Sequence, residues 1–421
     1  MDFEKIKLPN KVRLILVPDK NVNSVTVLGL VRIGSRYETE KNNGVSHFLE
    51  HMVFKGTKKR KTQTEIAEVL DKIGGHYNAF TSKEYTCFYA KVDNNHLETA
   101  LDWISDLMIN PLLKEDFFEK EKGTIIEEIK MYLDTPNKYI FDLWEKLLYG
   151  NQPMGRLIIG TQKNIKEMTI NQLSDYYKTN YTSNNEVVVI SGNFEKEKAK
   201  KLAKKYFSQV KAGKINKPIL VKEKQKKPEL FAHFKKTDQT HFCLGVRSYN
   251  LFHKDRYVVD VMSVILGGSI MSSRLWREMV GKGGLAYYVF CLTNEYLDSG
   301  NLHIWSGVAH KNLEKVGNII IKNFKKLKEE LVPDDELKKA KEYIKGSSKI
   351  GMESTDARAL FFGLQEVLTN KIIPLEERFK KIDKVSRMDI KRVANDIFRP
   401  EKLNLAIIGP HKIKKIPFLK I

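Results

Sequence analysis

The stretch His47-Phe48-Leu49-Glu50-His51 carries the strongest functional signal in this sequence. In a helix, His47 and His51 lie one above the other on the same face, so that both imidazoles reach one metal ion. Glu50 lies about 100° around the helix from His51 and can lean toward the same ion without entering its coordination sphere. Two histidines and a carboxylate at this spacing predict a zinc site with a general base beside it.

A catalytic zinc site usually has three protein ligands and a water molecule, so a third ligand must come from elsewhere. The segment Glu115–Leu133 is predicted to be a long helix, on which Glu121 and Glu128 lie within about 20° of each other. Glu127 lies about 100° away near the polar side, which favours Glu128 as the ligand. Two unpaired carboxylates would be unfavourable on a mostly apolar face, and ion pairs with lysines are the alternative explanation for them. The residues that flank the two carboxylates are Phe117, Phe118, Thr124, Ile125, Met131 and Tyr132.

The bulk composition indicates a folded protein of more than one domain. Its 421 residues exceed the length of about 100–200 that is usual for one domain. Hydrophobic residues make up 42% and charged residues 30%, a balance typical of globular proteins. No apolar stretch is long enough to cross a membrane, and residues 1–8 lack the apolar core of a secretory signal. We therefore expect a cytoplasmic protein with no membrane partner, unless a leader has been removed.

The formal net charge of +21 raises the question of nucleic-acid binding. The lysines are spread along the whole chain, and no cluster of arginine and aromatic residues accompanies them. We therefore expect a solvated, lysine-rich surface and no nucleic-acid partner. A positive inner surface that attracts acidic peptides is the second explanation of the charge.

The same order of strands and helices is predicted twice along the chain. In each half, strands come first, helices follow, and a buried strand ends the half. Lysines, a glycine and two prolines crowd residues 211–228, which predicts a linker. We expect an α+β fold of two similar tandem domains, each a mostly antiparallel sheet covered by helices. The predicted bounds are 1–215 for the zinc-bearing domain, 216–230 for the linker and 231–421 for a similar domain without a metal site.

Hydrophobic periodicity predicts the individual elements. Alternation or short apolar runs indicate strands, and apolar residues three or four positions apart indicate helices. The predicted strands are 12–17, 25–31, 86–92, 186–191, 242–246, 285–292 and 403–408. Besides the two helices already described, the predicted helices are 62–73, 96–108, 196–211, 257–266, 275–280, 312–331 and 334–345.

Several segments together resemble the pitrilysin/insulinase family of zinc peptidases. The resemblance is greatest to its branch of chains of about this length, which includes the mitochondrial processing peptidase and its bacterial relatives. It spans nearly the whole chain. The matching segments are 44–57 (GVSHFLEHMVFKGT), 74–82 (GGHYNAFTS), 125–129 (IIEEI), 155–161 (GRLIIGT) and 284–287 (GLAY).

This resemblance implies roles for particular residues. It places the third zinc ligand at Glu128, a supporting glutamate at Glu121 and the general base at Glu50. It also implies that Asn78-Ala79 belongs to an edge strand that pairs with the substrate backbone, which favours unfolded peptides of loosely defined sequence. Family members close two half-shells around a chamber, and in this branch each half-shell is a separate chain. We therefore expect one half of a clamshell, Zn²⁺ as cofactor, peptide substrates and a dimer.

One departure from the family pattern concerns the substrate clamp. The family has an arginine seven residues before the tyrosine that corresponds to Tyr287, and both bind substrate. Here that position is Val280, which cannot bond a substrate carbonyl, although Arg274 or Arg277 remain as substitutes. This departure leads to the hypothesis that the chain is the zinc-bearing subunit of a heterodimer whose partner has the complete clamp. A homodimer remains the other expectation.

The leading functional expectation is a zinc-dependent endopeptidase that cleaves short or unfolded peptides inside a closed chamber. The alternative is a non-catalytic or partner-dependent subunit of such a peptidase, or a peptide-binding protein. The presence of Glu50 favours the enzyme, because loss of the base is the simplest route to an inactive subunit.

Overall fold

Two compact units make up the protein, and the computed structural model describes residues 2–215, 217–268, 271–413, 415 and 418 of it. Each unit has its own sheet, its own helices and its own core. Unit 1 comprises Met1–Lys130, Arg156–Ile219 and Lys349–Pro374, and unit 2 comprises Met131–Gly155, Leu220–Ser348 and Leu375–Ile421.

A six-stranded sheet forms the centre of unit 1, in the order β1-β2-β6-β3-β5-β4. Strands β2 and β6 run parallel, and the other neighbours run antiparallel. Helix α3 contacts one part of this sheet, and β4 lies at its edge. The strands are β1 (Glu4–Lys7), β2 (Arg13–Pro18), β3 (Ser24–Val31), β4 (His76–Thr81), β5 (Thr86–Asp93) and β6 (Glu186–Gly192).

The five-stranded sheet of unit 2 repeats this topology in the order β7-β11-β8-β10-β9. Strands β7 and β11 run parallel, as β2 and β6 do, and an antiparallel ladder leads from there to the edge strand β9. Edge strand β9 therefore corresponds to β4, and the prediction of two similar tandem α+β domains with mostly antiparallel sheets is confirmed. The strands are β7 (Glu229–Phe234), β8 (Thr240–Ser248), β9 (Ala286–Glu295), β10 (Gly300–Val308) and β11 (Leu403–Gly409).

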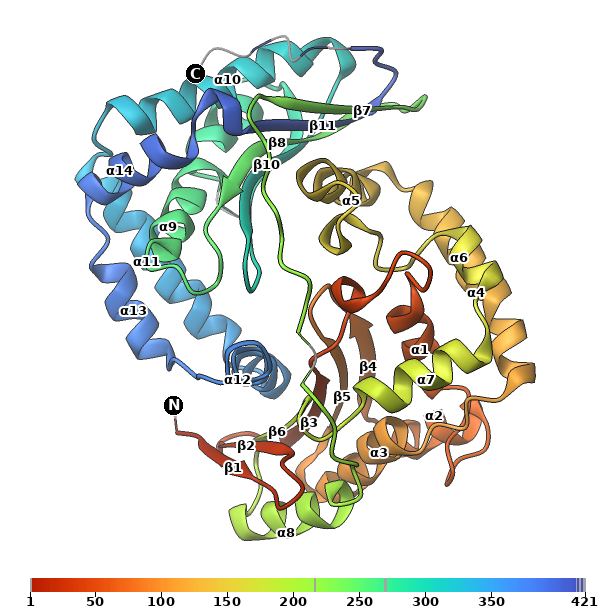
Figure 1. Cartoon of the computed structure of the whole chain (residues 1–421). Helices are drawn as coiled ribbons and strands as arrows, with labels where there is room; N and C mark the ends of the chain where they lie inside the picture. The colour runs from red at the N-terminus through yellow and green to blue at the C-terminus, as the bar shows by residue number, and fades with distance from the viewer. Residues whose placement is uncertain (1, 216, 269–270, 414, 416–417, 419–421) are drawn as a thin grey trace. The chain divides into compact units, whose positions relative to one another are not determined.

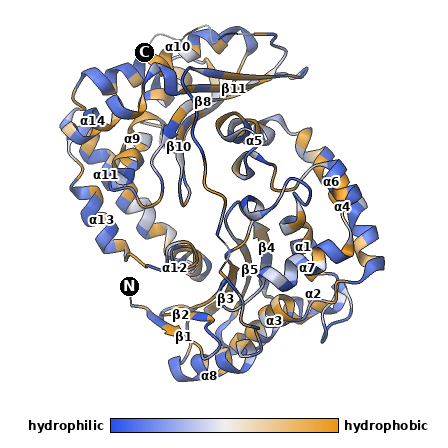
Figure 2. Ribbon diagram, viewed as in Figure 1, coloured by the Kyte–Doolittle hydropathy of each residue, from blue (hydrophilic) through white to orange (hydrophobic). Residues whose placement is uncertain are grey.

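Helices cover both sheets, and hydrophilic residues line the outer side of helices such as the lysine-rich α8 (Figure 2). In the first 219 residues the helices are α1 (Val45–Val53), α2 (Gln63–Asp71), α3 (Leu97–Ile109), α4 (Glu115–Leu133), α5 (Pro136–Tyr149), α6 (Gln162–Glu167), α7 (Ile170–Asn180) and α8 (Lys196–Phe207). After them come α9 (Arg256–Gly267), a π-helical turn at Trp276–Gly281, α10 (Leu313–Glu329), α11 (Asp334–Gly351), α12 (Thr355–Thr369), α13 (Leu375–Asp383) and α14 (Arg387–Ile397).

Two segments belong to the unit that their place in the sequence does not predict. Helix α5 lies in the first half of the chain but packs beside β8 and β11 in unit 2 (Figure 1). Its Leu143 and Trp144 join a core with Cys243. Helix α12 lies in the second half but packs on β3 and β6 of unit 1, where Phe362 and Val367 are buried.

The predicted contiguous domains, 1–215 and 231–421, therefore differ from the observed units in two segments. The physical reason is that an apolar helix face buries itself on whichever sheet is left uncovered, and periodicity does not identify that sheet. One of the points at which the chain passes from unit 1 to unit 2, Ile219–Leu220, lies inside the predicted linker 216–230. Asn216 lies outside the described residues, and the described residues from 217 to 228 form no helix or strand.

Most predicted elements occur where periodicity placed them. The long helix predicted over Glu115–Leu133 has those bounds in the structure. The helix predicted at 275–280 is a π-helical turn, in which backbone hydrogen bonds span one residue more than in an α-helix. Several elements were not predicted, among them α5, α7, α12, α13, α14, β7 and β10.

Candidate metal centre

A buried carboxylate fixes the start of helix α1, which carries the histidines. Glu38 accepts hydrogen bonds from the backbone N–H groups of Gly44 at 2.7 Å and Ser46 at 2.8 Å, and from Asn43 Nδ2 at 2.8 Å. Burial raises the pKa of Glu38, and these hydrogen bonds partly oppose the rise. A carboxylate at a helix N-terminus satisfies free N–H groups and interacts favourably with the helix dipole.

Two glycines allow a second loop to lie against this helix start. Gly44 has a φ of 100° and Gly160 a φ of 80°, in the left-handed region that glycine tolerates. A Cβ atom on Gly44 would lie 2.8 Å from the backbone oxygen of Ile159, and one on Gly160 would lie 2.6 Å from that of Asn43. The segment 155–161, one of those that resemble the family, therefore supports the helix that holds the site.

Helices α1 and α4 bring together three side chains that could hold a metal ion. One donor atom from each of His47, His51 and Glu128 lies within 4.8 Å of the others. His47 Nε2 is 3.8 Å from Glu128 Oε1, and His51 Nε2 is 3.4 Å from Glu128 Oε2. Behind them, Phe48 of α1 and Phe118 of α4 stack with ring centroids 4.6 Å apart, and both are fully buried.

The chemistry and spacing of this donor set fit a zinc ion. Bonds of about 2.0–2.2 Å to nitrogen and oxygen in a tetrahedron put neighbouring donors roughly 3.3–3.5 Å apart. The separations of 3.4 Å from His51 to Oε2 of Glu128 and of 3.8 Å from His47 to its other oxygen, Oε1, are close to that range. Two imidazoles and one carboxylate are also the donor set of many catalytic zinc sites, which leave the fourth position open.

Glu121 supports the site from behind. Its Oε1 accepts a hydrogen bond from His51 Nδ1 at 2.8 Å, and its Oε2 pairs with Lys55 Nζ at 2.8 Å. A histidine that donates its Nδ1 proton to a carboxylate keeps its Nε2 lone pair directed at the metal position. The lysine ion pair that was the alternative explanation for Glu121 is therefore present together with the supporting contact.

Fewer of the residues predicted for the apolar face of α4 are buried than expected. Phe118 and Ile125 are fully buried, but Thr124 is exposed and Met131 is 65% exposed. Glu127, which was interpreted as solvated, has a side chain that is 71% exposed and pairs with Lys130. Helical geometry predicts Glu128 as the residue near the histidines, and the structure places Glu128 there.

Glu50 points to the same region from α1. Its Oε2 accepts a hydrogen bond from Thr81 Oγ1 at 2.5 Å. Burial raises the pKa of the Glu50 carboxyl, while the Thr81 hydrogen bond and the charge of His51 oppose the rise. A carboxylate with a raised pKa is a stronger base than an ordinary glutamate.

The two histidines have very different pKa values. For His51, burial favours the neutral form, but hydrogen bonds to Glu121 and Glu128 outweigh it and raise its pKa to about 9. For His47, burial and then the charge of His51 lower the pKa to about 4. At neutral pH the pair therefore holds one positive charge, on His51.

The edge strand β4 has its backbone open where the resemblance places the peptide. Asn78 is exposed, Ala79 is 9% exposed, and Asn78 Oδ1 accepts a hydrogen bond from the Ala79 N–H at 2.8 Å. Because Ser82 N–H donates to Tyr85 O, the alternation of an antiparallel pair turns the N–H and C=O of Ala79 away from β5. These groups face the open edge of the sheet.

In unit 2, the residues considered for a substrate clamp have different surroundings. Tyr287 lies near the start of edge strand β9 and is 65% exposed. Val280 packs against the core, and Arg274 is bound by Glu336, with its Nε 2.9 Å from Oε1. Arg277 is exposed, and the described part of the chain offers its side chain no hydrogen-bond or ion-pair partner. Of the two proposed substitutes, Arg277 is thus the one free to contact a ligand.

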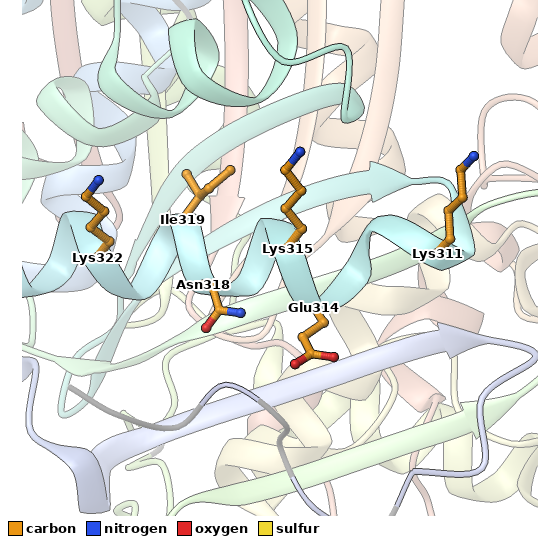
Figure 3. Close-up of a pocket in the computed structure, with 6 residues that line it drawn as sticks. All are labelled: Lys311, Glu314, Lys315, Asn318, Ile319 and Lys322. Atoms are coloured by element: carbon orange, nitrogen blue, oxygen red, sulfur yellow. The ribbon is translucent and has the colours of Figure 1, made fainter.

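A separate hollow in unit 2 lies along α10 and the turn before it (Figure 3). It contains no histidine or cysteine, so it offers none of the nitrogen or sulfur donors that zinc prefers. Its lining residues are Lys311, Glu314, Lys315, Asn318, Ile319 and Lys322.

Fold and site together define a class: an α+β protein of two repeated units, one of which carries a helix-borne cluster with the donors of a zinc site. Residues 13–162 match the family described as insulinase (peptidase family M16), and residues 167–344 match the peptidase M16 inactive domain. The chain belongs to the M16 (insulinase) family of peptidases, as the resemblance predicted.

Relatives of known sequence support this assignment. The chain is 37% identical over 404 residues to the uncharacterized zinc protease YmxG of Bacillus subtilis, covering 95% of this chain and 97% of that protein. It is 31% identical over 420 residues to an uncharacterized zinc protease of Streptomyces coelicolor, covering 97% and 90%.

Solved structures share the fold. A protease from Helicobacter pylori superposes with a TM-score of 0.91 at 26% identity, covering 97% of this chain and 99% of that one. A peptidase M16 inactive domain from Pseudomonas fluorescens superposes with a TM-score of 0.89 at 19% identity, covering 99% and 100%, which shows the fold alone.

Within the described residues, no helix has both the length and the apolar character that crossing a membrane requires.

Sequence reasoning missed three residues that shape the site: Glu38, Lys55 and Thr81. Lys55 and Thr81 lie inside segments that resemble the family, but nothing in their spacing indicates which side chain they contact. Glu38 lies six residues before Gly44, too far for an ordinary capping pattern.

Zinc binding is predicted to release about one proton at pH 7, because His51 is protonated in the metal-free protein and must lose that proton to bind a metal. The apparent zinc affinity is expected to rise with pH up to about 9, the pKa of His51, and then to level off. Calorimetric titration of the metal-free protein in buffers of different ionisation enthalpy measures the proton count. Zinc binding without proton release at pH 7 would contradict the assignment of the charge to His51.

Glu121→Gln is predicted to weaken zinc binding by about 10- to 100-fold, because it removes the charge that orients His51. The matched control is Glu127→Gln, the same change on the same helix at an exposed residue, which is expected to leave zinc affinity unchanged. Competition with a chromophoric chelator measures both. Equal affinities for the two variants would show that Glu121 has no supporting role.

Proposed function

We propose that the protein is a zinc-dependent endopeptidase. The observation that carries this proposal is the convergence of His47, His51 and Glu128, with the carboxylate of Glu50 near enough to interact electrostatically with His51 and Glu128. Membership of a peptidase family and the relatives named as zinc proteases support it.

The protein's own residues supply the steps of peptide hydrolysis. His47, His51 and Glu128 would hold the zinc ion, which when bound lowers the pKa of water to near neutrality and polarises a carbonyl oxygen. Glu50 accepts a proton from the attacking water and later delivers it to the leaving amine. Glu121 keeps His51 in the orientation that metal binding needs.

The peptide substrate is proposed to lie along β4 as an added strand. The backbone of Ala79 faces the open edge, and Asn78 lies beside it with an exposed side chain. Strand addition binds the main chain of the substrate, so it requires an extended and unfolded segment and tolerates many sequences. The Ala79 N–H donates a hydrogen bond to Asn78 Oδ1, so an incoming peptide carbonyl has to displace this side-chain oxygen.

Glu50→Gln is predicted to lower kcat for an unfolded peptide by at least about 100-fold, because it removes the base while keeping the shape of the side chain. Zinc content is expected to stay at the wild-type level, since the three ligands are unchanged. Cleavage is followed by mass spectrometry and zinc by atomic absorption. Peptide cleavage that survives this substitution would refute the proposed function.

A second half-shell chain is proposed as the natural partner, and the state of the clamp favours a related subunit over an identical one. Val280 packs on the core and Arg274 is held by Glu336, which leaves the exposed Arg277 as the one substitute for the arginine of the family pattern. Native mass spectrometry of the complex isolated from its source is expected to reveal a similar chain with the complete arginine–tyrosine pair. Full activity of a homodimer alone would contradict the heterodimer.

A further inference from the structure

The hydrogen bond between Thr81 and Glu50 connects the helix that carries the proposed base with the strand that is proposed to bind the peptide. Glu50 belongs to α1, and Thr81 is the last residue of β4, the strand proposed to receive the peptide. We propose that Thr81 is a positioning residue, whose hydroxyl holds the Glu50 carboxylate in place and links it to the substrate strand. This inference rests on the proposed function, because it assigns Glu50 the role of base.

The geometry leaves half of the Glu50 carboxylate free to react. Thr81 Oγ1 lies 2.5 Å from Glu50 Oε2, and an ionised carboxylate accepts hydrogen bonds only, so the Thr81 hydroxyl is the donor. Hydrogen bonds to a charged acceptor are short and about twice as strong as neutral ones. With Oε2 held, Oε1 remains available for the proton of a water molecule, and the long glutamate side chain loses freedom to turn away.

The backbone of Thr81 faces the same open edge as that of Ala79. Backbone groups alternate in an antiparallel pair, and the hydrogen bond from Ser82 N–H to Tyr85 O directs even-numbered residues of β4 toward β5. Tyr77, Ala79 and Thr81 therefore present their N–H and C=O groups to an added strand. A peptide paired with β4 then contacts the backbone of the residue whose side chain holds the base.

The neighbouring strand keeps Thr81 in position without competing for its hydroxyl. Thr81 pairs across the sheet with Thr86, which is fully buried. Thr86 Oγ1 donates to the backbone oxygen of Ile33 at 2.9 Å. The Thr86 hydroxyl is thus already satisfied, and that of Thr81 remains directed at Glu50.

The test compares Thr81→Val, which removes the hydroxyl but keeps the branched shape, with Thr81→Ser, which keeps the hydroxyl. Thr81→Val is expected to lower kcat by about 10- to 100-fold, with KM and zinc content close to wild type. Thr81→Ser is expected to recover most of kcat. The matched control is Thr26→Val, which removes a buried hydroxyl from β3 of the same sheet, where it bonds Thr355 at 2.8 Å. The control is expected to keep kcat.

The inference is overturned if Thr81→Val retains wild-type kcat, if it alters KM alone, or if Thr81→Ser is as slow as Thr81→Val. A measurement of Tm on the zinc-loaded protein tests the contact without any need for activity. Thr81→Val is expected to lower Tm in the wild-type background and to have little effect beside Glu50→Ala. Equal shifts in both backgrounds would refute the contact. Cleavage by Glu50→Gln would instead refute the proposed function, so the two failures are distinguishable.

Discussion

The contact of α1 with α4 is the constraint on which the candidate metal centre depends. The stacked rings of Phe48 and Phe118 hold these helices in one register, with His51 opposite both Glu121 and Glu128. A shift of one residue along α4 would turn its side chains by about 100° and carry both glutamates out of reach. The geometry of a polar site is thus set by apolar contacts behind it, which resist displacement because protein interiors are closely packed.

The two units repeat one topology, and a comparison of equivalent helices shows which features belong to the fold and which belong to the site. Helix α9 follows β8 in unit 2 as α1 follows β3 in unit 1, so both helices occupy the same place in the repeat. Ten of the twelve residues of α9 are buried, and none is a histidine. One copy of this helix therefore fills a core, whereas the other carries the cluster of His47, Glu50 and His51.

The features that could be predicted from the sequence are those that depend on regular spacing. His47 and His51 are neighbours because of helical periodicity, and the same arithmetic selected Glu128 over Glu127 on a helix whose bounds were correctly predicted. The unpredicted features depend on which surfaces meet. An amphipathic pattern does not say that α5 and α12 exchange units, and a threonine at the end of a strand does not show that its hydroxyl reaches Glu50.

The exchange of α5 and α12 also bears on how the chain is made. The sheet of unit 1 has all six strands once Gly192 has been synthesised, but the helix that buries Phe362 and Val367 on it follows much later. At about 5–20 residues per second, the ribosome needs roughly 10–35 s to pass from residue 192 to residue 374. Throughout that interval the apolar face of the unit 1 sheet lacks the helix that covers it. Chaperones that shield apolar surfaces would act on this part of the nascent chain within that interval.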